Sequence, residues 1–89
     1  MPFDRNFPRT FSAPSIRQYA PAYSGVYGLS NARGWVYIGE SDNIQESLLA
    51  HLSAAGDATG FVFEICDPAL RAKRWDRLIH EYEPVRNRR

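Results

Sequence analysis

Two short runs rich in aromatic and β-branched residues decide the fold, and they read Tyr23-Ser-Gly-Val-Tyr-Gly-Leu29 and Trp35-Val-Tyr-Ile-Gly39. The segment between them, Ser30-Asn-Ala-Arg-Gly34, contains the asparagine and glycine that are typical of tight turns. We therefore predict a β-hairpin over residues 23–39. Strict alternation would put every second residue of the second strand on one face of the sheet: Trp35, Tyr37 and Gly39.

Three further elements are predicted after the hairpin. The segment Ser41-Asp42-Asn43 supplies side-chain oxygens that cap helices, and apolar residues at helical spacing follow as far as Ala55. Residues 61–66 predict a third strand, Asp67-Pro68 is typical of a helix start, and Pro84 stops that second helix. The inner face of the second helix carries an apolar stripe: Trp75, Leu78, Ile79 and Tyr82. The order ββαβα predicts a small α+β domain, with a three-stranded antiparallel sheet flanked by helices.

The composition limits the chain to one folded domain. Its 89 residues are 44% hydrophobic and 24% charged, which is ordinary for a soluble globular protein. Four prolines fall within residues 1–22, so we expect an irregular N-terminal arm there and the folded domain over residues 23–89. The three phenylalanines of this arm, Phe3, Phe7 and Phe11, favour contact with the domain or self-association into a homo-oligomer. No apolar run approaches the roughly 20 residues that cross a bilayer, and we expect a cytoplasmic protein without a membrane partner.

Charge is distributed unevenly along the chain. Residues 34–70 contain six acidic residues and no lysine or arginine, whereas residues 71–89 contain seven basic and three acidic residues. Two interpretations follow. The basic residues form a surface that binds nucleic-acid phosphates or an acidic protein, or they pair with the acidic residues inside the folded domain.

The hairpin carries the triplets Gly25-Val26-Tyr27 and Tyr37-Ile38-Gly39, and this pair resembles the signature of the GIY-YIG nuclease family. Further landmarks match in order and spacing, so that the resemblance spans residues 23–87: Ser41, Asn43-Ile44, His51, Leu78-Ile79 and Pro84-Val-Arg-Asn87. The resemblance implies a phosphodiester-cleaving site on one side of the sheet. In such a site, tyrosines position and activate a water, a helix arginine stabilises phosphate charge, and a glutamate holds one divalent metal.

Residue by residue, the resemblance retains the tyrosines and loses both charged positions. Tyr27 and Tyr37 match the tyrosines of the family. The position of the helix arginine falls on Ser47, and the position of the metal-binding glutamate falls on Trp75. Because a hard divalent cation requires oxygen ligands, an indole cannot take the place of the glutamate. We therefore expect a domain that is not a nuclease and that needs no cofactor.

The leading functional hypothesis is a non-catalytic module that binds nucleic acid or protein. Its candidate contact residues are Arg33, His51, Arg71, Arg74, Arg77 and Asn87. A first alternative is an active DNA or RNA endonuclease dependent on Mg²⁺ or Mn²⁺, with Glu64 as a relocated metal ligand. Glu64 alternates with Phe63 and Ile65, which would direct its carboxylate to the open side of the sheet. A second alternative is a structural subunit of a larger assembly.

Overall fold

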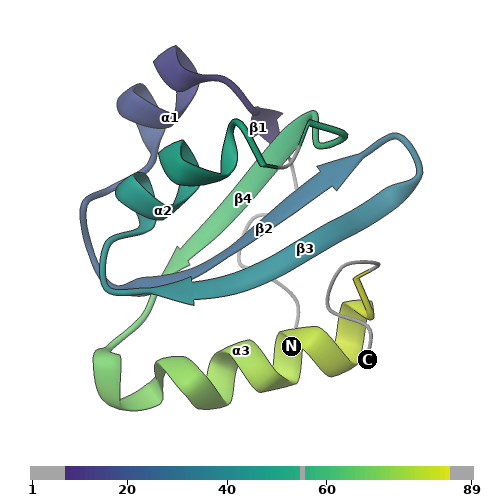
Figure 1. Ribbon diagram of the computed structural model, residues 1–89. Coiled ribbons are helices and arrows are strands. Elements are labelled where there is room, and N and C mark those ends of the chain that lie inside the picture. Colours follow the sequence, from purple (N-terminus) through teal and green to yellow (C-terminus); the bar gives the residue numbers. More distant parts are fainter. Residues whose placement is uncertain (1–7, 55, 85–89) are drawn as a thin grey trace.

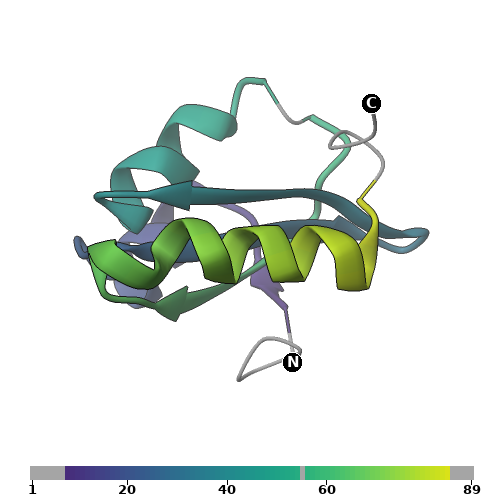
Figure 2. The ribbon, with the colours of Figure 1, turned by 90° about the horizontal axis from the view of Figure 1, so that it is seen from below.

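The computed structural model describes residues 8–54 and 56–84. The elements follow in the order β1 (Arg9–Thr10), α1 (Ala13–Tyr19), β2 (Gly25–Asn31), β3 (Gly34–Ser41), α2 (Ile44–His51), β4 (Gly60–Ile65) and α3 (Pro68–Tyr82). The strands form one antiparallel sheet of four strands in the order β1-β4-β2-β3. Helices α1 and α2 cover one face of this sheet and α3 covers the other (Figure 1, Figure 2). The predicted α+β class is confirmed, and the sheet has one strand more than predicted.

The additional strand and helix come from the segment that the prolines marked as irregular. Within residues 1–22, β1 pairs with β4, and α1 packs against the sheet, so the prediction of an irregular arm is wrong for residues 9–19. The physical reason is that Pro14 lies in the first turn of α1, where a missing backbone N–H is tolerated, and Ser12 caps the helix. Phe11 packs edge-on against Phe61, with 6.5 Å between ring centroids. Phe3 and Phe7 lie outside the described residues.

The variant Ile16→Val tests whether α1 belongs to the folded core, because Ile16 lies on α1 and is fully buried. The variant Ile16→Val is expected to lower the free energy of unfolding by about 1 kcal/mol, because the lost methyl group leaves a small cavity in a packed core. Urea unfolding followed by circular dichroism measures the change. The matched control is Ile65→Val, since Ile65 is 61% exposed and should tolerate the same deletion. Equal stability of the two variants would show that α1 does not belong to the core.

β2 and β3 form the predicted hairpin, but a β-bulge changes which residues share a face. The register passes from Leu29 opposite Tyr37 to Ser30 opposite Trp35, so Val36 is an extra residue on β3. Alternation is interrupted at this point. Trp35 consequently packs in the cluster beneath α3, whereas Tyr37 packs in the cluster beneath α1 and α2. The prediction that Trp35 and Tyr37 share a face is therefore wrong.

Helix α2 begins where the capping residues predict and ends early. The Asn43 side chain caps the helix by accepting a hydrogen bond of 3.0 Å from the backbone N–H of Glu46. The last helical residue is His51, and turns follow over residues 52–54. The predicted end at Ala55 falls on a residue outside the described ranges.

Helix α3 has the predicted boundaries. Asp67 caps it through a 2.9 Å hydrogen bond from the backbone N–H of Ala69, and Pro68 is its first residue. Glu83 ends it with a left-handed backbone, φ 47°, directly before Pro84. No helix in the described part of the chain is long and apolar enough to span a membrane.

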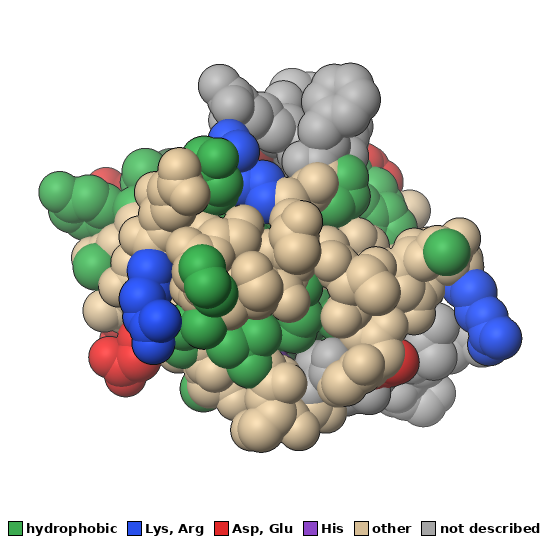
Figure 3. Space-filling view, turned by 90° about the horizontal axis from the view of Figure 1, so that it is seen from above, with side chains coloured by type: hydrophobic (Ala, Val, Ile, Leu, Met, Phe, Trp, Pro, Cys, Tyr) green, Lys and Arg blue, Asp and Glu red, His purple; other side chains and the backbone are tan. Residues whose placement is uncertain are grey.

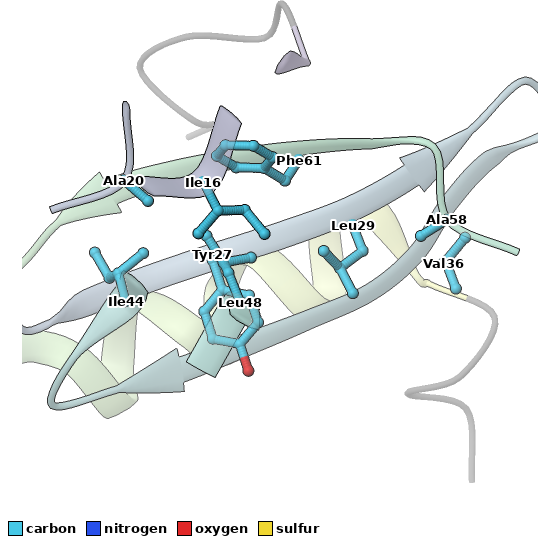
Figure 4. Close-up of a cluster of buried hydrophobic side chains, with 9 residues drawn as sticks. All are labelled: Ile16, Ala20, Tyr27, Leu29, Val36, Ile44, Leu48, Ala58 and Phe61. Carbon is cyan, nitrogen blue, oxygen red and sulfur yellow. The ribbon is translucent and has the colours of Figure 1, made fainter. Parts of the chain in front are cut away.

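The sheet separates two hydrophobic clusters. The cluster between the sheet and helices α1 and α2 has nine buried members, shown in Figure 4: Ile16, Ala20, Tyr27, Leu29, Val36, Ile44, Leu48, Ala58 and Phe61. The cluster between the sheet and α3 consists of Val26, Ile38, Val62 and Leu78, with partly buried Trp35, Trp75, Ile79 and Tyr82 packed against it. The apolar stripe predicted for α3 is confirmed, since all four of its residues belong to this second cluster.

Candidate functional site

The two signature tyrosines lie side by side on the sheet face covered by α1 and α2. The ring centroids of Tyr27, on β2, and Tyr37, on β3, are 6.2 Å apart. Gly39 is the cross-strand partner of Tyr27. A Cβ atom at position 39 would lie 2.5 Å from the Tyr27 hydroxyl and 2.8 Å from the Tyr37 ring. The glycine of the second triplet is therefore required by the space that the tyrosine side chains occupy.

His51, in the last turn of α2, completes a cluster of three rings. Its Nε2 lies 2.9 Å from the hydroxyl oxygen of Tyr27. The His51 ring is also 5.6 Å from the Tyr27 ring and 5.1 Å from the Tyr37 ring, measured between centroids. Figure 4 shows the Tyr27 hydroxyl pointing out of the apolar cluster in which the rest of its ring is packed. Both tyrosines and the histidine singled out from the sequence are thus brought together.

Burial raises the pKa of the Tyr27 phenol well above its ordinary value, and the adjacent Tyr37 raises it further. A hydrogen bond with Ser47 acts in the opposite direction and is weaker in effect. Tyr27 is only 3% exposed, which explains why burial is the main cause. The Tyr27 phenol, whose oxygen lies within hydrogen-bonding distance of His51 Nε2, therefore keeps its proton to higher pH than an ordinary tyrosine.

This raised pKa predicts a loss of stability at high pH. An unfolded tyrosine releases its proton near pH 10, whereas folded Tyr27 retains it, so the native state holds more protons and the free energy of unfolding decreases as pH rises above about 10. The variant Tyr27→Phe is expected to show a shallower decrease. Urea unfolding at a series of pH values measures how steeply the free energy of unfolding of each protein decreases with pH. The control is Tyr23→Phe, which alters a phenol on a residue that is 66% exposed and should behave like the unmodified chain. Parallel slopes for all three proteins would contradict the prediction.

Ser47 occupies the position that the GIY-YIG resemblance assigns to the helix arginine. Its hydroxyl oxygen lies 2.5 Å from that of Ser41. The Ser41 hydroxyl in turn donates to the backbone carbonyl of Asn43 and accepts from its backbone N–H, each at 2.9 Å. The hydroxyl groups of Ser41 and Ser47 thus stabilise the connection between β3 and α2 by hydrogen bonding. A neutral hydroxyl cannot supply the positive charge that an arginine would bring to a phosphate.

Trp75 occupies the position assigned to the metal-binding glutamate, and it is partly buried against the second hydrophobic cluster. Its indole packs in the cluster beneath α3, and its N–H donates a 2.9 Å hydrogen bond to the backbone carbonyl of Ile38. Ile38 directly follows Tyr37 on β3, one of the two edge strands of the sheet. The indole N–H therefore satisfies a backbone carbonyl of β3, the strand that carries Tyr37.

Glu64, the candidate for a relocated metal ligand, lies on the opposite side of the sheet from the tyrosines. Its cross-strand partner is Val26, of the cluster beneath α3, whereas the partner of Tyr27 is Phe63. Directly opposed residues share a face, so the alternation argument for Glu64 is correct, but α3 covers the side it points to. The Glu64 carboxylate accepts two hydrogen bonds from Arg74, at 2.7 and 2.8 Å.

The residues present do not fit the divalent metal that the resemblance implies. Within residues 8–54 and 56–84, no group of three or more histidine, cysteine, aspartate and glutamate side chains is placed to hold a metal ion. The nearest counterpart of the expected ligand is an indole, and the substitute carboxylate is neutralised by an arginine on the other side of the sheet. We derive no catalytic step through a metal at this site.

Two of the three arginines predicted to bind phosphate on α3, Arg71 and Arg74, are paired within the domain. Arg71 donates to Glu40 at 3.0 Å, to Asp42 at 2.5 Å and to the Ser24 hydroxyl at 3.1 Å. Hydrogen bonds to the two carboxylates raise the pKa of the Arg71 guanidinium. With the Arg74–Glu64 pair, these contacts support internal charge pairing for the first residues of the basic segment 71–89.

The remaining candidate contact residues that the structure describes are exposed. Arg33 is exposed in the hairpin turn, and Arg77 is exposed on α3. The hairpin turn lies at the end of the molecule opposite to the start of α3 (Figure 1), whereas the end of α3 lies near the hairpin, since the ring centroids of Trp35 and Tyr82 are 4.7 Å apart. Figure 3, which looks onto the face covered by α1 and α2, shows basic side chains scattered toward the edges rather than gathered in one patch. Asn87 lies outside the described residues.

Comparison with known proteins supports the fold at the level of structure alone. No protein-family model matches the chain, and no curated protein sequence matches it. Among solved structures, the chain is similar to the GIY-YIG N-terminal endonuclease domain of UvrC from Thermotoga maritima. A point mutant of that domain, bound to its catalytic divalent cation, has a TM-score of 0.71 and 23% identity over 83% of this chain and 96% of that chain. The same domain bound to magnesium gives a TM-score of 0.70 and 22% identity over 82% and 96% of the two chains. The chain has a GIY-YIG-like fold.

Proposed function

We propose that this chain is a non-catalytic binding domain with a GIY-YIG-like fold. The observation that carries the proposal is Trp75, whose indole packs against the sheet and bonds to Ile38 where a nuclease would need an anionic metal ligand. The similar UvrC domain binds a catalytic divalent cation. In this chain the position that the resemblance assigns to the metal ligand carries a side chain that packs against the second hydrophobic cluster, which favours a structural role there over a catalytic one.

The chemistry of phosphodiester hydrolysis supports the same conclusion. The reaction needs a deprotonated nucleophile and positive charge where negative charge develops. Ser47 brings a neutral hydroxyl to the arginine position, and the pKa of Tyr27 is raised away from neutral pH. Loss of a metal ligand and loss of a charged donor each remove several kcal/mol of transition-state stabilisation, which together would abolish most turnover.

The described surface favours a protein partner over nucleic acid. A phosphate backbone is bound through several unpaired lysines and arginines that release counterions. Arg71 and Arg74 are already engaged by carboxylates. Binding to a phosphate chain would have to break these ion pairs. We therefore infer that any nucleic-acid binding by this domain is weak and disappears as salt rises.

Manganese binding tests the proposal. The electron paramagnetic resonance signal of free Mn²⁺ decreases when the ion binds a protein, and we expect no saturable decrease with this chain. The variants Glu64→Gln and Glu46→Gln form a matched pair, since Glu46 is an exposed glutamate on α2. Saturable binding that is lost in Glu64→Gln and kept in Glu46→Gln would overturn the proposal in favour of the relocated-carboxylate nuclease.

A further inference from the structure

The outer side of β3 has no neighbouring strand in the described part of the chain. On the other side of the hairpin, the backbone N–H of Cys66 donates to the Ser24 carbonyl at 3.0 Å, and these two residues continue the register of β2 with β4. In an antiparallel sheet, successive residues of a central strand direct their backbone groups alternately to its two neighbours. The even-numbered residues of β2 therefore bond to β4, and its odd-numbered residues bond to β3.

This alternation identifies the backbone groups of β3 that point out of the sheet. Gly39 is opposite Tyr27, and Tyr37 is opposite Leu29. Both of these β3 residues therefore direct their backbone groups to β2. Ile38, between them, directs its backbone groups to the open edge. Such outward groups are a template on which another strand can pair, and globular proteins usually obstruct them.

Helix α3 lies along this edge and runs in the direction opposite to β3 (Figure 1). Near the start of α3, the Arg71 guanidinium donates to the Glu40 carboxylate at 3.0 Å. At the end of α3, the Tyr82 ring lies 4.7 Å from the Trp35 ring, measured between centroids. The two contacts hold α3 beside β3 over most of the length of the strand.

Trp75 lies between these two contacts, and its side chain reaches the backbone of β3. It follows Arg71 by four residues, so both side chains project from the same face of α3. The indole N–H donates a 2.9 Å hydrogen bond to the Ile38 carbonyl, which is an outward-pointing group. A strand added to β3 would need this carbonyl as an acceptor for its own backbone N–H. In the domain the indole already engages it.

We propose that Trp75 closes the outer edge of β3 against the addition of a further strand. The indole contributes in two ways, because it engages an outward carbonyl and it helps to hold a helix beside the strand. An ionised glutamate at this position could not do the same, since a carboxylate only accepts hydrogen bonds. This protective role goes beyond the proposed function, and it does not depend on the absence of catalysis.

The variant Trp75→Phe tests the proposal, because it keeps an aromatic ring and removes the N–H donor. In a purified sample, the strand available to pair with an opened edge is β3 of a second copy. We expect the association constant of Trp75→Phe to exceed that of the unmodified chain by about tenfold or more. Sedimentation equilibrium from about 10 µM to about 1 mM, where weak association becomes measurable, gives both constants.

A control variant and a site-specific measurement exclude other causes of association. Leu78 is fully buried in the cluster beneath α3, so Leu78→Val lowers stability there and keeps the indole. This control should associate like the unmodified chain, and circular dichroism verifies that each variant is folded. Glu40 is opposite Val26, an even-numbered residue of β2, so its backbone N–H also points outward. Amide hydrogen exchange at Glu40 should therefore slow as Trp75→Phe associates.

Three results would overturn the proposal. The first is an association constant that Trp75→Phe leaves unchanged. The second is an equal increase for Leu78→Val, which would attribute association to lost stability. The third is association of Trp75→Phe without slower exchange at Glu40, which would indicate a contact elsewhere. Nuclease activity of the unmodified chain would overturn the proposed function and leave the protection of the β3 edge unaffected.

Discussion

Replacing Trp75 with alanine is expected to lower the free energy of unfolding by about 3 kcal/mol, which is the usual effect of removing a packed aromatic side chain. The indole packs against the cluster that contains Ile38 and Leu78, and its N–H bonds to the Ile38 carbonyl. Both contributions disappear in the variant. Urea unfolding followed by far-ultraviolet circular dichroism measures the change.

Two further variants separate packing from hydrogen bonding at this position. Trp75→Phe retains an aromatic ring and loses the N–H donor, and we expect a loss of about 1 kcal/mol on that account, with a packing change in addition. Tyr23→Ala removes an aromatic side chain that is 66% exposed and should change stability little. If Trp75→Ala were no more harmful than Tyr23→Ala, the indole would not be a core residue, and the position would be free to serve another purpose.

Removing Arg74 while Glu64 remains is expected to lower the free energy of unfolding by about 2–3 kcal/mol. The two side chains are 15% and 14% exposed, so Arg74→Met leaves a carboxylate with little access to water and without its partner. Glu64→Gln together with Arg74→Met removes the pair as a whole. This double variant should be more stable than Arg74→Met alone, because no unpaired charge is left buried.

The same helix provides the control for this ion pair. Arg77 is exposed on α3, and Arg77→Met should change stability by less than about 0.5 kcal/mol. A double-mutant cycle from urea unfolding yields the coupling between Arg74 and Glu64. If Arg74→Met and Arg77→Met were equally harmless, the pair would be a surface contact, and Glu64 would be available for a different role.

Local signals in the sequence predicted most of the element boundaries. Asn43 and Asp67 cap helices through their own side chains, and Pro84 follows the end of α3, so short-range chemistry decides these positions. The β1–α1 segment was missed because its prolines dominated the local pattern. Its place in the fold depends instead on Ile16, which is buried by residues distant in sequence.

The sequence pattern did not predict contacts between residues that are distant in the sequence. The bulge at Val36 depends on how β2 and β3 pair. It places the Trp35 side chain on the sheet face covered by α3, opposite to the face that carries Tyr37. The partner of Glu64 depends on where α3 packs on the sheet, which no spacing rule supplies. Such features follow from tertiary packing, and alternation within one strand carries no information about them.

The candidate site was predictable to the extent that it follows the two triplets. Tyr27 and Tyr37 are adjacent because both lie on the hairpin, where Tyr27 is opposite Gly39 and Tyr37 lies two residues before Gly39 on β3. Spacing located Ser47 and Trp75. The contact between Ser41 and Ser47 was missed, although both residues had been noted separately, because serine hydroxyls have many local partners in any loop. The structure adds that Trp75 bonds to β3 itself.

We propose that this GIY-YIG-like domain does not cleave phosphodiesters, because Ser47 and Trp75 stand where the resemblance places the charged groups that hydrolysis requires. The decisive measurement is incubation of the purified chain with supercoiled plasmid and with a hairpin RNA, in Mg²⁺ or Mn²⁺. We predict no cleavage beyond that of the Tyr37→Phe variant prepared in the same way. Metal-dependent cleavage by the unmodified chain that Tyr37→Phe abolishes would show that the domain is an active nuclease.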